Sequence, residues 1–463
     1  MNVYISTMGC PKNIVDSENL AGLLESEGFA VVDSPEEADW MIVNTCGFIG
    51  DAKEESIARI FELAALKDAA AEKGRTKRLL VSGCLSERYL KDLYREMPEV
   101  DVFCGVNDYE LVPKLIRDFE ADHERVAVKC EPDKDYPEFG TRKRSKEAPW
   151  TAYLKIAEGC DNVCTYCIIP KIRGPYRSRK PESILEEARK LAAEGVKELV
   201  LVAQDVTAYG FDFDGKYHLA ELLRELCRID GIVWIRLLYC YEDRITDELI
   251  ETIKDEPKIC KYIDIPLQHA STKVLRAMKR RSTFTSTERT LKKIRRRIPG
   301  IVVRTTLITG FPGETKEDFR ILYDFVKNER FGRLGVFPYS KEEGTEAAVM
   351  DHQIRKDVKE RRRDKIMELQ RGISLDNNKS FVNRILPVLI EESDGEENGV
   401  FTYIGRSEYD APEIDNGVIV TSRVPLLPGT FVDVRIVDAY DYDLVGEALT
   451  DSANGNESGG ERK

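Results

Sequence analysis

Residues 158–170 read Glu-Gly-Cys-Asp-Asn-Val-Cys-Thr-Tyr-Cys-Ile-Ile-Pro, and they place Cys160, Cys164 and Cys167 in one short loop with the spacing C-x3-C-x2-C. Zinc in structural sites normally takes four closed ligands. A four-iron cluster held by three cysteines instead keeps one iron open to a substrate or cofactor. Three cysteines within eight residues seldom meet by chance in a packed core, so we predict that these thiolates are catalytic cluster ligands.

The segments that follow this loop alternate between strand-like and helical patterns. Six strand-like runs occupy the central part of the chain: 152–157, 198–203, 232–238, 262–266, 302–309 and 334–339. This alternation predicts an incomplete (βα)6 barrel, whose active site faces the carboxyl ends of the strands. The cysteine loop directly follows the first strand, which places the loop at that end.

Three more cysteines close short β-type runs within the first hundred residues. The runs and their cysteines are 3–7 with Cys10, 40–44 with Cys46, and 79–82 with Cys84. Helical patterns follow each run, which predicts a doubly wound parallel sheet with helices on both faces and its strand ends at one edge. A free cysteine is commonly a buried core residue. The shared position at strand ends nevertheless favours a second metal site with these three thiolates as ligands.

Composition divides the rest of the chain. We expect an N-terminal domain over 1–117, a charged linker over 118–145 and the barrel core over 146–376. Short alternating strands separated by turns predict a small antiparallel β-barrel over 379–449. The polar, glycine-rich residues 450–463 are predicted to be disordered.

The overall composition indicates a cytoplasmic protein. No run approaches the roughly 18 consecutive apolar residues of a membrane span, and the first residues lack the basic and apolar regions of a secretion signal. Eleven cysteines in a reducing compartment are better explained as thiols and metal ligands than as disulfides. The net charge of −13 argues against broad affinity for nucleic acids.

The cysteine loop, with Tyr166 before its last cysteine, resembles the signature of radical S-adenosylmethionine (SAM) enzymes. Longer stretches resemble the methylthiotransferases of that group: Gly-Cys-Pro-Lys-Asn-Ile-Val-Asp-Ser-Glu at 9–18, Val-Asn-Thr-Cys-Gly-Phe-Ile at 43–49, and Cys-Ile-Ile-Pro-Lys-Ile-Arg-Gly at 167–174. The resemblance covers about residues 1–449 and all six cysteines. It implies an N-terminal cluster domain, a radical SAM core and a terminal TRAM module.

The resemblance also implies the cofactors, which are two [4Fe–4S] clusters and SAM. In such enzymes one SAM is the radical source and a second SAM supplies the methyl group, while the N-terminal cluster mediates delivery of sulfur. Neither the immediate sulfur donor nor the electron donor follows from the sequence.

Four further residues are candidate contacts of SAM. Tyr166 lies within the cysteine loop. Gln204 and Asp205 follow the second barrel strand, where radical SAM enzymes typically contact the amino group of SAM. Gly310 follows the fifth strand, where a glycine lets a ligand approach the backbone. Ordinary turn chemistry is the alternative at Gln204, Asp205 and Gly310.

Two branches of the resembling family differ in substrate. One modifies adenosine in transfer RNA, and the other, the RimO type, modifies an aspartate of ribosomal protein S twelve. Pro11-Lys12-Asn13 after Cys10, and Asp-Ile-Pro-Leu-Gln-His at 264–269, resemble the protein branch. Residues 381–449 hold 4 arginines, no lysine and 14 acidic residues, a net charge of −10. This charge suits a basic ribosomal protein and makes direct RNA binding unfavourable.

We therefore expect β-methylthiolation of an aspartate of ribosomal protein S twelve, which is the expected protein partner. One alternative is the transfer-RNA adenosine methylthiotransferase. An alternative of another class is a non-catalytic iron–sulfur electron carrier, which predicts closed four-cysteine sites and no cleavage of SAM.

Overall fold

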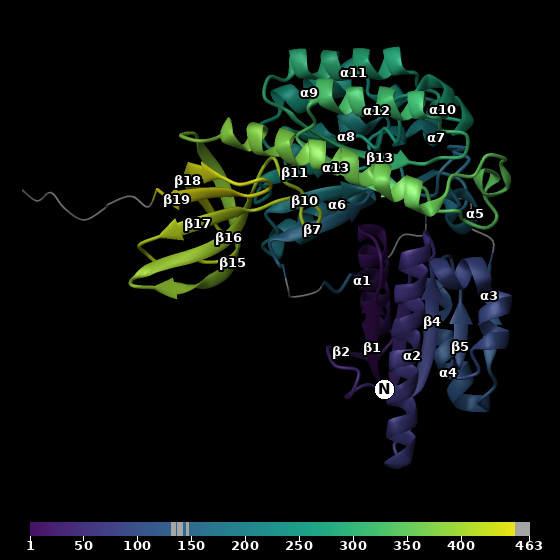
Figure 1. Cartoon of the computed structure of the whole chain (residues 1–463). Helices are drawn as coiled ribbons and strands as arrows, with labels where there is room; N and C mark the ends of the chain where they lie inside the picture. Colours follow the sequence, from purple (N-terminus) through teal and green to yellow (C-terminus); the bar gives the residue numbers. More distant parts are fainter. Residues whose placement is uncertain (131–135, 137–141, 145–147, 450–463) are drawn as a thin grey trace, which may run out of the picture.

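Three structural units follow one another along the chain (Figure 1). The structure is a computed structural model that describes residues 1–130, 136, 142–144 and 148–449. The N-terminal unit lies below the large central unit, and the small C-terminal unit lies beside the central one. The predicted disorder of 450–463 concerns residues outside the described part.

The N-terminal unit is a six-stranded parallel sheet in the order β2-β1-β3-β4-β5-β6. Its strands are β1 (Asn2–Thr7), β2 (Ala30–Val32), β3 (Trp40–Thr45), β4 (Arg78–Gly83), β5 (Val102–Cys104) and β6 (Val126–Val128). Its helices are α1 (Pro11–Ser26), α2 (Gly50–Glu72), α3 (Cys84–Glu96), the 3-10 turn η1 (Tyr109–Leu111) and α4 (Val112–Asp122). All of β3 is buried, as expected of a parallel strand covered on both faces.

Helices cover both faces of this sheet. Buried side chains of α1 and α4, such as Leu24 and Phe119, pack on one face with Trp40 and Ile42. Those of α2 and α3 pack on the other face with Met41 and Val43. The prediction of a doubly wound sheet is confirmed.

The predicted linker begins too early. Residues 118–122 belong to α4 and residues 126–128 form β6, which extends the sheet by pairing Val128 with Cys104 of β5. A strand of three residues is too short to show a hydrophobic alternation in the sequence. It forms because it pairs with a neighbouring strand, which the local sequence does not reveal.

The central unit contains the six predicted parallel strands. They are β7 (Thr151–Lys155), β10 (Glu198–Val202), β11 (Trp234–Leu237), β12 (Tyr262–Asp264), β13 (Val302–Thr309) and β14 (Arg333–Pro338). Two three-stranded sheets, β7-β10-β11 and β12-β13-β14, meet where Ile235 bridges Ile259. The result is an open, incomplete barrel, as predicted.

Helices surround the outer face of these strands. The larger ones are α6 (Pro181–Ala193), α8 (Leu219–Cys227), α9 (Asp247–Asp255), α10 (Thr272–Ala277), α11 (Phe284–Arg297), α12 (Lys316–Glu329) and α13 (Lys356–Lys379). The short elements are β8 (Ala157–Glu158), β9 (Arg177–Ser178), α5 (Ile169–Arg173), α7 (Phe211–Asp214), and the 3-10 turns η2 (Val206–Ala208), η3 (Glu242–Arg244) and η4 (Glu346–Val349).

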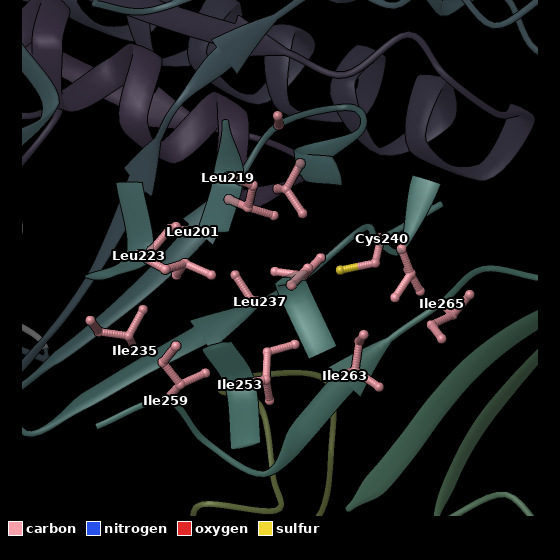
Figure 2. Close-up of a cluster of buried hydrophobic side chains, with 14 of the residues drawn as sticks. Leu201, Leu219, Leu223, Ile235, Leu237, Cys240, Ile253, Ile259, Ile263 and Ile265 are labelled. Carbon is pink, nitrogen blue, oxygen red and sulfur yellow. The ribbon is translucent and has the colours of Figure 1, made fainter. Parts of the chain in front are cut away.

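Side chains along each barrel strand point alternately outward, to the core beneath the helices, and inward, to the barrel lumen. Figure 2 shows Leu201, Ile235 and Leu237 packed with Leu223 of α8 and Ile253 of α9. Their strand neighbours, such as Val200 and Trp234, belong to a second core that faces the lumen. The period of two along each strand produces this division.

The C-terminal unit is a closed five-stranded barrel in the order β15-β16-β17-β19-β18. Its strands are β15 (Ile385–Glu397), β16 (Val400–Ser407), β17 (Val418–Ser422), β18 (Phe431–Ala439) and β19 (Leu444–Ala448). The predicted antiparallel barrel is wrong in one respect, because β17 and β19 run parallel and the barrel is mixed. The reason is closure: β18 pairs with β15, so β19 must fill the gap between β17 and β18.

The loop after β16 enters the lumen of the central barrel. Tyr409 and Ala411 join the lumen core with Tyr262 of β12. Arg333 at the start of β14 donates to Asp410 at 2.9 Å from Nε. The C-terminal barrel is therefore packed into the amino-terminal end of the central one, opposite the cysteine loop.

Across the ranges that the structure describes, none of the helices combines the length and apolar character needed to cross a membrane.

Candidate metal-cluster and cofactor site

The cysteines of the N-terminal unit converge at one edge of its sheet. Cys10 precedes α1, Cys46 follows β3, and Cys84 begins α3. The adjoining glycines bring their backbones into contact. A Cβ on Gly9 would lie 2.6 Å from Cys46 Cβ, and one on Gly47 would lie 2.8 Å from the Cys84 carbonyl carbon. The predicted convergence of the three strand ends is therefore present.

The surroundings of the three thiols shift their pKa values in different directions. Burial raises the pKa of Cys84 to about 12 and also raises the pKa of Cys46. Burial opposes ionisation at Cys10 too, but Lys12 and Arg173 outweigh it and lower the pKa of that thiol. Two cations are thus placed to stabilise negative charge at this edge.

The second triad lies in the loop that follows β8 at the carboxyl end of β7. The Cys167 amide donates to the Cys164 carbonyl at 3.1 Å, which closes a tight turn. Thr165 ties the loop to two other segments. Its amide donates to the Met278 carbonyl at 3.1 Å, and its carbonyl accepts from the Ala347 amide at 2.9 Å. The loop is held from both sides.

Each end of this loop has specific contacts around its thiols. Cys160 Sγ lies 3.4 Å from Asn162 Nδ2, and Cys164 Sγ lies 2.9 Å from the Tyr241 hydroxyl oxygen. Burial raises the pKa of Cys160 to about 11 and raises that of Cys167. Gly159 must be glycine, because its φ is +78° and a Cβ would lie 1.9 Å from the Pro175 carbonyl oxygen.

The four candidate SAM contacts have different environments. Tyr166 packs beside a small apolar cluster that includes Phe311. Gln204 donates from Nε2 to Glu158 at 2.7 Å, while its buried Oε1 has no hydrogen-bond partner in the described part of the chain. Asp205 is fully buried and already accepts from Thr207 at 2.6 Å.

Asp205 has further partners that lead back to the cysteine loop. Asn162 donates to its Oδ2 at 3.2 Å, and Arg244 forms an ion pair with the same oxygen. Asp205 thereby positions Asn162 beside Cys160. Its contact with SAM remains a prediction.

Gly310 is engaged within the protein. Its amide donates to Glu314 Oε2 at 2.6 Å. A Cβ at this position would lie 2.3 Å from Lys359 Cγ of α13. The glycine permits this close approach of α13, and its predicted contact with SAM is not tested by these contacts.

A buried charged network joins the two triads through Arg173. This residue is 1% exposed, and its Nη2 lies 3.3 Å from Cys84 Sγ and donates to Asn13 at 2.5 Å. Its Nη1 donates to Asp16 and to Glu158, each at 2.9 Å. Asp16 belongs to the N-terminal unit, whereas Glu158 directly precedes the cysteine loop.

Lys155 completes this network from the end of β7. Its ammonium pairs with Asp16 and, at 2.7 Å, with Glu158. Burial favours the neutral acid at Glu158, but Arg173 and Lys155 outweigh it and hold the pKa of this carboxyl well below its usual range. We name Asp16, Lys155, Glu158 and Arg173 the bridging network.

The sequence did not predict the bridging network. One signal was present: Lys155 closes the strand Thr-Ala-Tyr-Leu-Lys and is 2% exposed, and a charged residue at such a buried position normally has a partner. Its partner Asp16 lies 139 residues away, so no local pattern could identify it.

No group of three or more His, Cys, Asp or Glu side chains within the described ranges is spaced to hold a single metal ion. Neither triad is therefore a preformed site for one ion. Cluster ligation by the six cysteines remains a prediction, and the chemistry of the donor set, three thiols in each group, is that of iron–sulfur sites.

Comparisons with protein families match three regions. Residues 2–105 match "Uncharacterized protein family UPF0004", residues 154–326 match the "Radical SAM superfamily", and residues 382–449 match the "TRAM domain". These regions correspond to the three structural units.

Two similar proteins span almost the whole chain. "Ribosomal protein uS12 methylthiotransferase RimO" of Acetivibrio thermocellus is 48% identical over 97% of this chain and 99% of its own length. The protein of the same name from Caldanaerobacter subterraneus subsp. tengcongensis is 51% identical over 96% of this chain and 99% of its own.

Among solved structures, the radical S-adenosylmethionine methyltransferase TsrM from Kitasatospora setae superposes with a TM-score of 0.56, 17% identity, and 72% of each chain covered. The cobalamin-dependent radical enzyme OxsB has a TM-score of 0.52 and 12% identity, over 80% of this chain and 56% of that one. At such identities the likeness concerns the fold alone.

Proposed function

This chain belongs to the RimO family of radical SAM methylthiotransferases, and we propose that it transfers a methylthio group to the β-carbon of an aspartate in ribosomal protein uS12. The observation that carries the proposal is the pairing of two cysteine triads through one buried network. Such a pairing suits a reaction that needs sulfur at one site and a substrate radical at the other.

Each triad, in this proposal, holds one [4Fe–4S] cluster: Cys10, Cys46 and Cys84 the first, and Cys160, Cys164 and Cys167 the second. Cys160, Cys164 and Cys167 would hold the cluster that supplies, when reduced, the electron for cleavage of SAM. The orphaned Gln204 Oε1 supports SAM binding, because a buried carbonyl oxygen without a partner is an acceptor for the amino group of SAM. Tyr166 is an adjoining candidate contact.

The chain's own residues position and shield this site. Tyr241 lies against Cys164, and the Arg280 guanidinium lies 3.8 Å from the centroid of the Tyr241 ring. Asn162, held by Asp205, lies against Cys160. Side chains that are held by neighbours of their own keep a ligand-bearing loop in one geometry and exclude water from it.

The surface charge of the C-terminal barrel supports a basic protein substrate. Some of its acidic residues form ion pairs within the protein, as Asp410 does with Arg333. The end of β15 nevertheless presents an exposed acidic row: Glu392, Asp394, Glu396 and Glu397. Such a row attracts a basic ribosomal protein and repels RNA phosphates.

A substrate assay tests the proposal. The reconstituted, reduced protein is incubated with SAM, a sulfur source, and either purified uS12 or transfer RNA, and the products are analysed by mass spectrometry. We expect a methylthio mass gain on an aspartate of uS12. A mass gain on adenosine alone would replace this function with that of the transfer-RNA branch.

Removal of one ligand tests the cluster assignment. We expect about eight irons per chain in the wild-type protein and about four in Cys164→Ala, because each cluster contains four. The variant should also release no 5′-deoxyadenosine from SAM. The matched control is Cys130→Ala, an exposed cysteine outside both triads, which should keep both readouts. A Cys164→Ala protein that still cleaves SAM would contradict the assignment.

A further inference from the structure

Lys12 is a buried cation without a carboxylate partner. The side chain is 8% exposed, and no carboxylate of the described residues lies within ion-pair distance of its ammonium group. Buried charges in proteins are normally paired. Lys155, the other buried lysine near the triads, has two carboxylates. Lys77 and Lys359, which are also buried without a carboxylate, donate to backbone carbonyls. Among the described residues Lys12 has only the Tyr239 ring and the Cys10 thiol beside it, so its ammonium keeps capacity for an anion that enters from outside the chain.

The position of Lys12 lies between the two cysteine triads. Its Nζ is 3.6 Å from the centroid of the Tyr239 ring, and the residue follows Cys10 by two positions. Tyr239 lies at the carboxyl end of the barrel strands, where its carbonyl accepts from the Val206 amide at 3.2 Å. Two residues further on, Tyr241 contacts Cys164.

The surroundings of Lys12 favour an anion. The groups that interact with its charge are the Tyr239 side chain, the Cys10 thiol and the Arg173 guanidinium. Arg173 is already engaged by Asp16 and Glu158. Lys12 also stabilises negative charge at Cys10, but unlike Arg173 it has no carboxylate among the described residues, so it can still meet a negative group that enters between the two units.

We propose that the Lys12 ammonium binds the side-chain carboxylate of the substrate aspartate. This inference rests on the function proposed above and identifies a specificity-determining residue for it. The carboxyl carbon of aspartate is bonded directly to the β-carbon. A carboxylate held by Lys12 therefore places the carbon to be modified between the N-terminal cysteine triad and the loop that carries Cys160, Cys164 and Cys167.

Binding measurements test this role independently of turnover. The probes are purified uS12 and the same protein with its target aspartate replaced by asparagine, titrated against reconstituted enzyme by calorimetry. We expect the wild-type enzyme to prefer the aspartate form by on the order of tenfold, as for a charge-assisted hydrogen bond. Lys12→Met should bind both forms equally. Lys171→Met, a change of the same kind at an exposed lysine, should keep the preference.

A second variant guards against loss of the neighbouring cluster. If Lys12→Met retains less iron than the wild type, the binding measurement is made on Tyr239→Leu instead. This substitution removes the ring that orients the Lys12 ammonium and changes no charge or cysteine. Tyr239→Leu should reduce the preference for aspartate at unchanged iron content. An unchanged preference in the variant that keeps its iron would overturn the role of Lys12. Failure of the wild-type enzyme to modify uS12 would instead overturn the proposed function.

Discussion

Arg173 connects the two cysteine-bearing units through a single guanidinium group. It contacts Cys84 and Asn13 on one side and Glu158 on the other, and Asp16 lies between. All of these side chains are buried. Removing one member of a buried ion network leaves the others charged and unpaired, which is far more costly than the loss of a surface pair.

We expect Arg173→Met to lower the free energy of unfolding by about 3 to 5 kcal/mol, the usual cost of breaking a buried ion pair. Thermal melting followed by circular dichroism, on the cluster-free protein, measures the effect. The matched control is Arg228→Met, which breaks the exposed pair with Glu225 and should leave the melting temperature nearly unchanged. Equal melting temperatures of the two variants would show that the bridging network does not stabilise the fold.

At the scale of the element, the ends of β1, β3 and β4 are brought together by backbones that tolerate no side chain. Gly9 has a φ of +91° and faces Cys46, while Gly83 has a φ of +93° and faces the Thr45 backbone. A parallel sheet places successive strand ends side by side. The glycines then allow the segments that follow to pack closely enough for three thiols to share one edge.

Gly9→Ala should disturb this edge. The added methyl group would lie 2.6 Å from Cys46 Cβ, so Cys46 and the segment that follows β1 must move apart. We expect the iron content of the reconstituted protein to fall from about eight to about four per chain, because the N-terminal triad no longer holds a cluster.

Gly28→Ala is the control for backbone strain. Its φ of +85° resembles that of Gly9, but nothing lies within 4 Å of the added methyl group. Both substitutions carry a left-handed strain of roughly 1–2 kcal/mol, and only Gly9→Ala adds a clash. Equal iron contents in the two variants would assign the effect to strain rather than to packing.

At the scale of the whole molecule, the C-terminal barrel closes the amino-terminal end of the central one through buried ion pairs. Glu198 at the start of β10 accepts from Arg236 at 2.8 Å and from Arg406 of β16 at 2.6 Å. Burial opposes ionisation, but Arg406 and Arg236 outweigh it and lower the pKa of Glu198 to about 2. Docking of the two barrels therefore depends on this carboxylate.

The stability of the protein should fall as the pH falls below about 4.5. An unfolded glutamate takes up its proton near pH 4.3, whereas folded Glu198 takes it up only near pH 2. Between these values the unfolded state binds more protons, so acid favours unfolding. The contribution is fully present above the unfolded pKa and is lost as the pH falls through the folded one.

Glu198→Gln isolates this contribution. Melting temperatures of the wild type and the variant, measured from pH 7 to pH 2, should differ most above pH 4.5 and converge toward pH 2. A difference that is constant over this range would exclude ionisation of Glu198 as its cause.

Much of this architecture is local and was predictable. All six barrel strands, the three strand-and-cysteine units and the position of the cysteine loop follow from hydrophobic period and from short motifs, which depend on neighbours along the chain. Cys160, Cys164 and Cys167 were recognised by their spacing within eight residues, whereas Cys10, Cys46 and Cys84 were recognised because each follows a strand-like run.

Contacts between distant segments were not predictable in this way. Strand β6 was missed because it depends on pairing with β5. The C-terminal barrel is mixed because β19 lies between β17 and β18, a position that only the closed barrel defines. The bridging network joins Asp16 to Lys155 across 139 residues. Residue identity specifies that a buried charge needs a partner, but the partner is chosen by proximity in space, and proximity exists only once the three units have packed together.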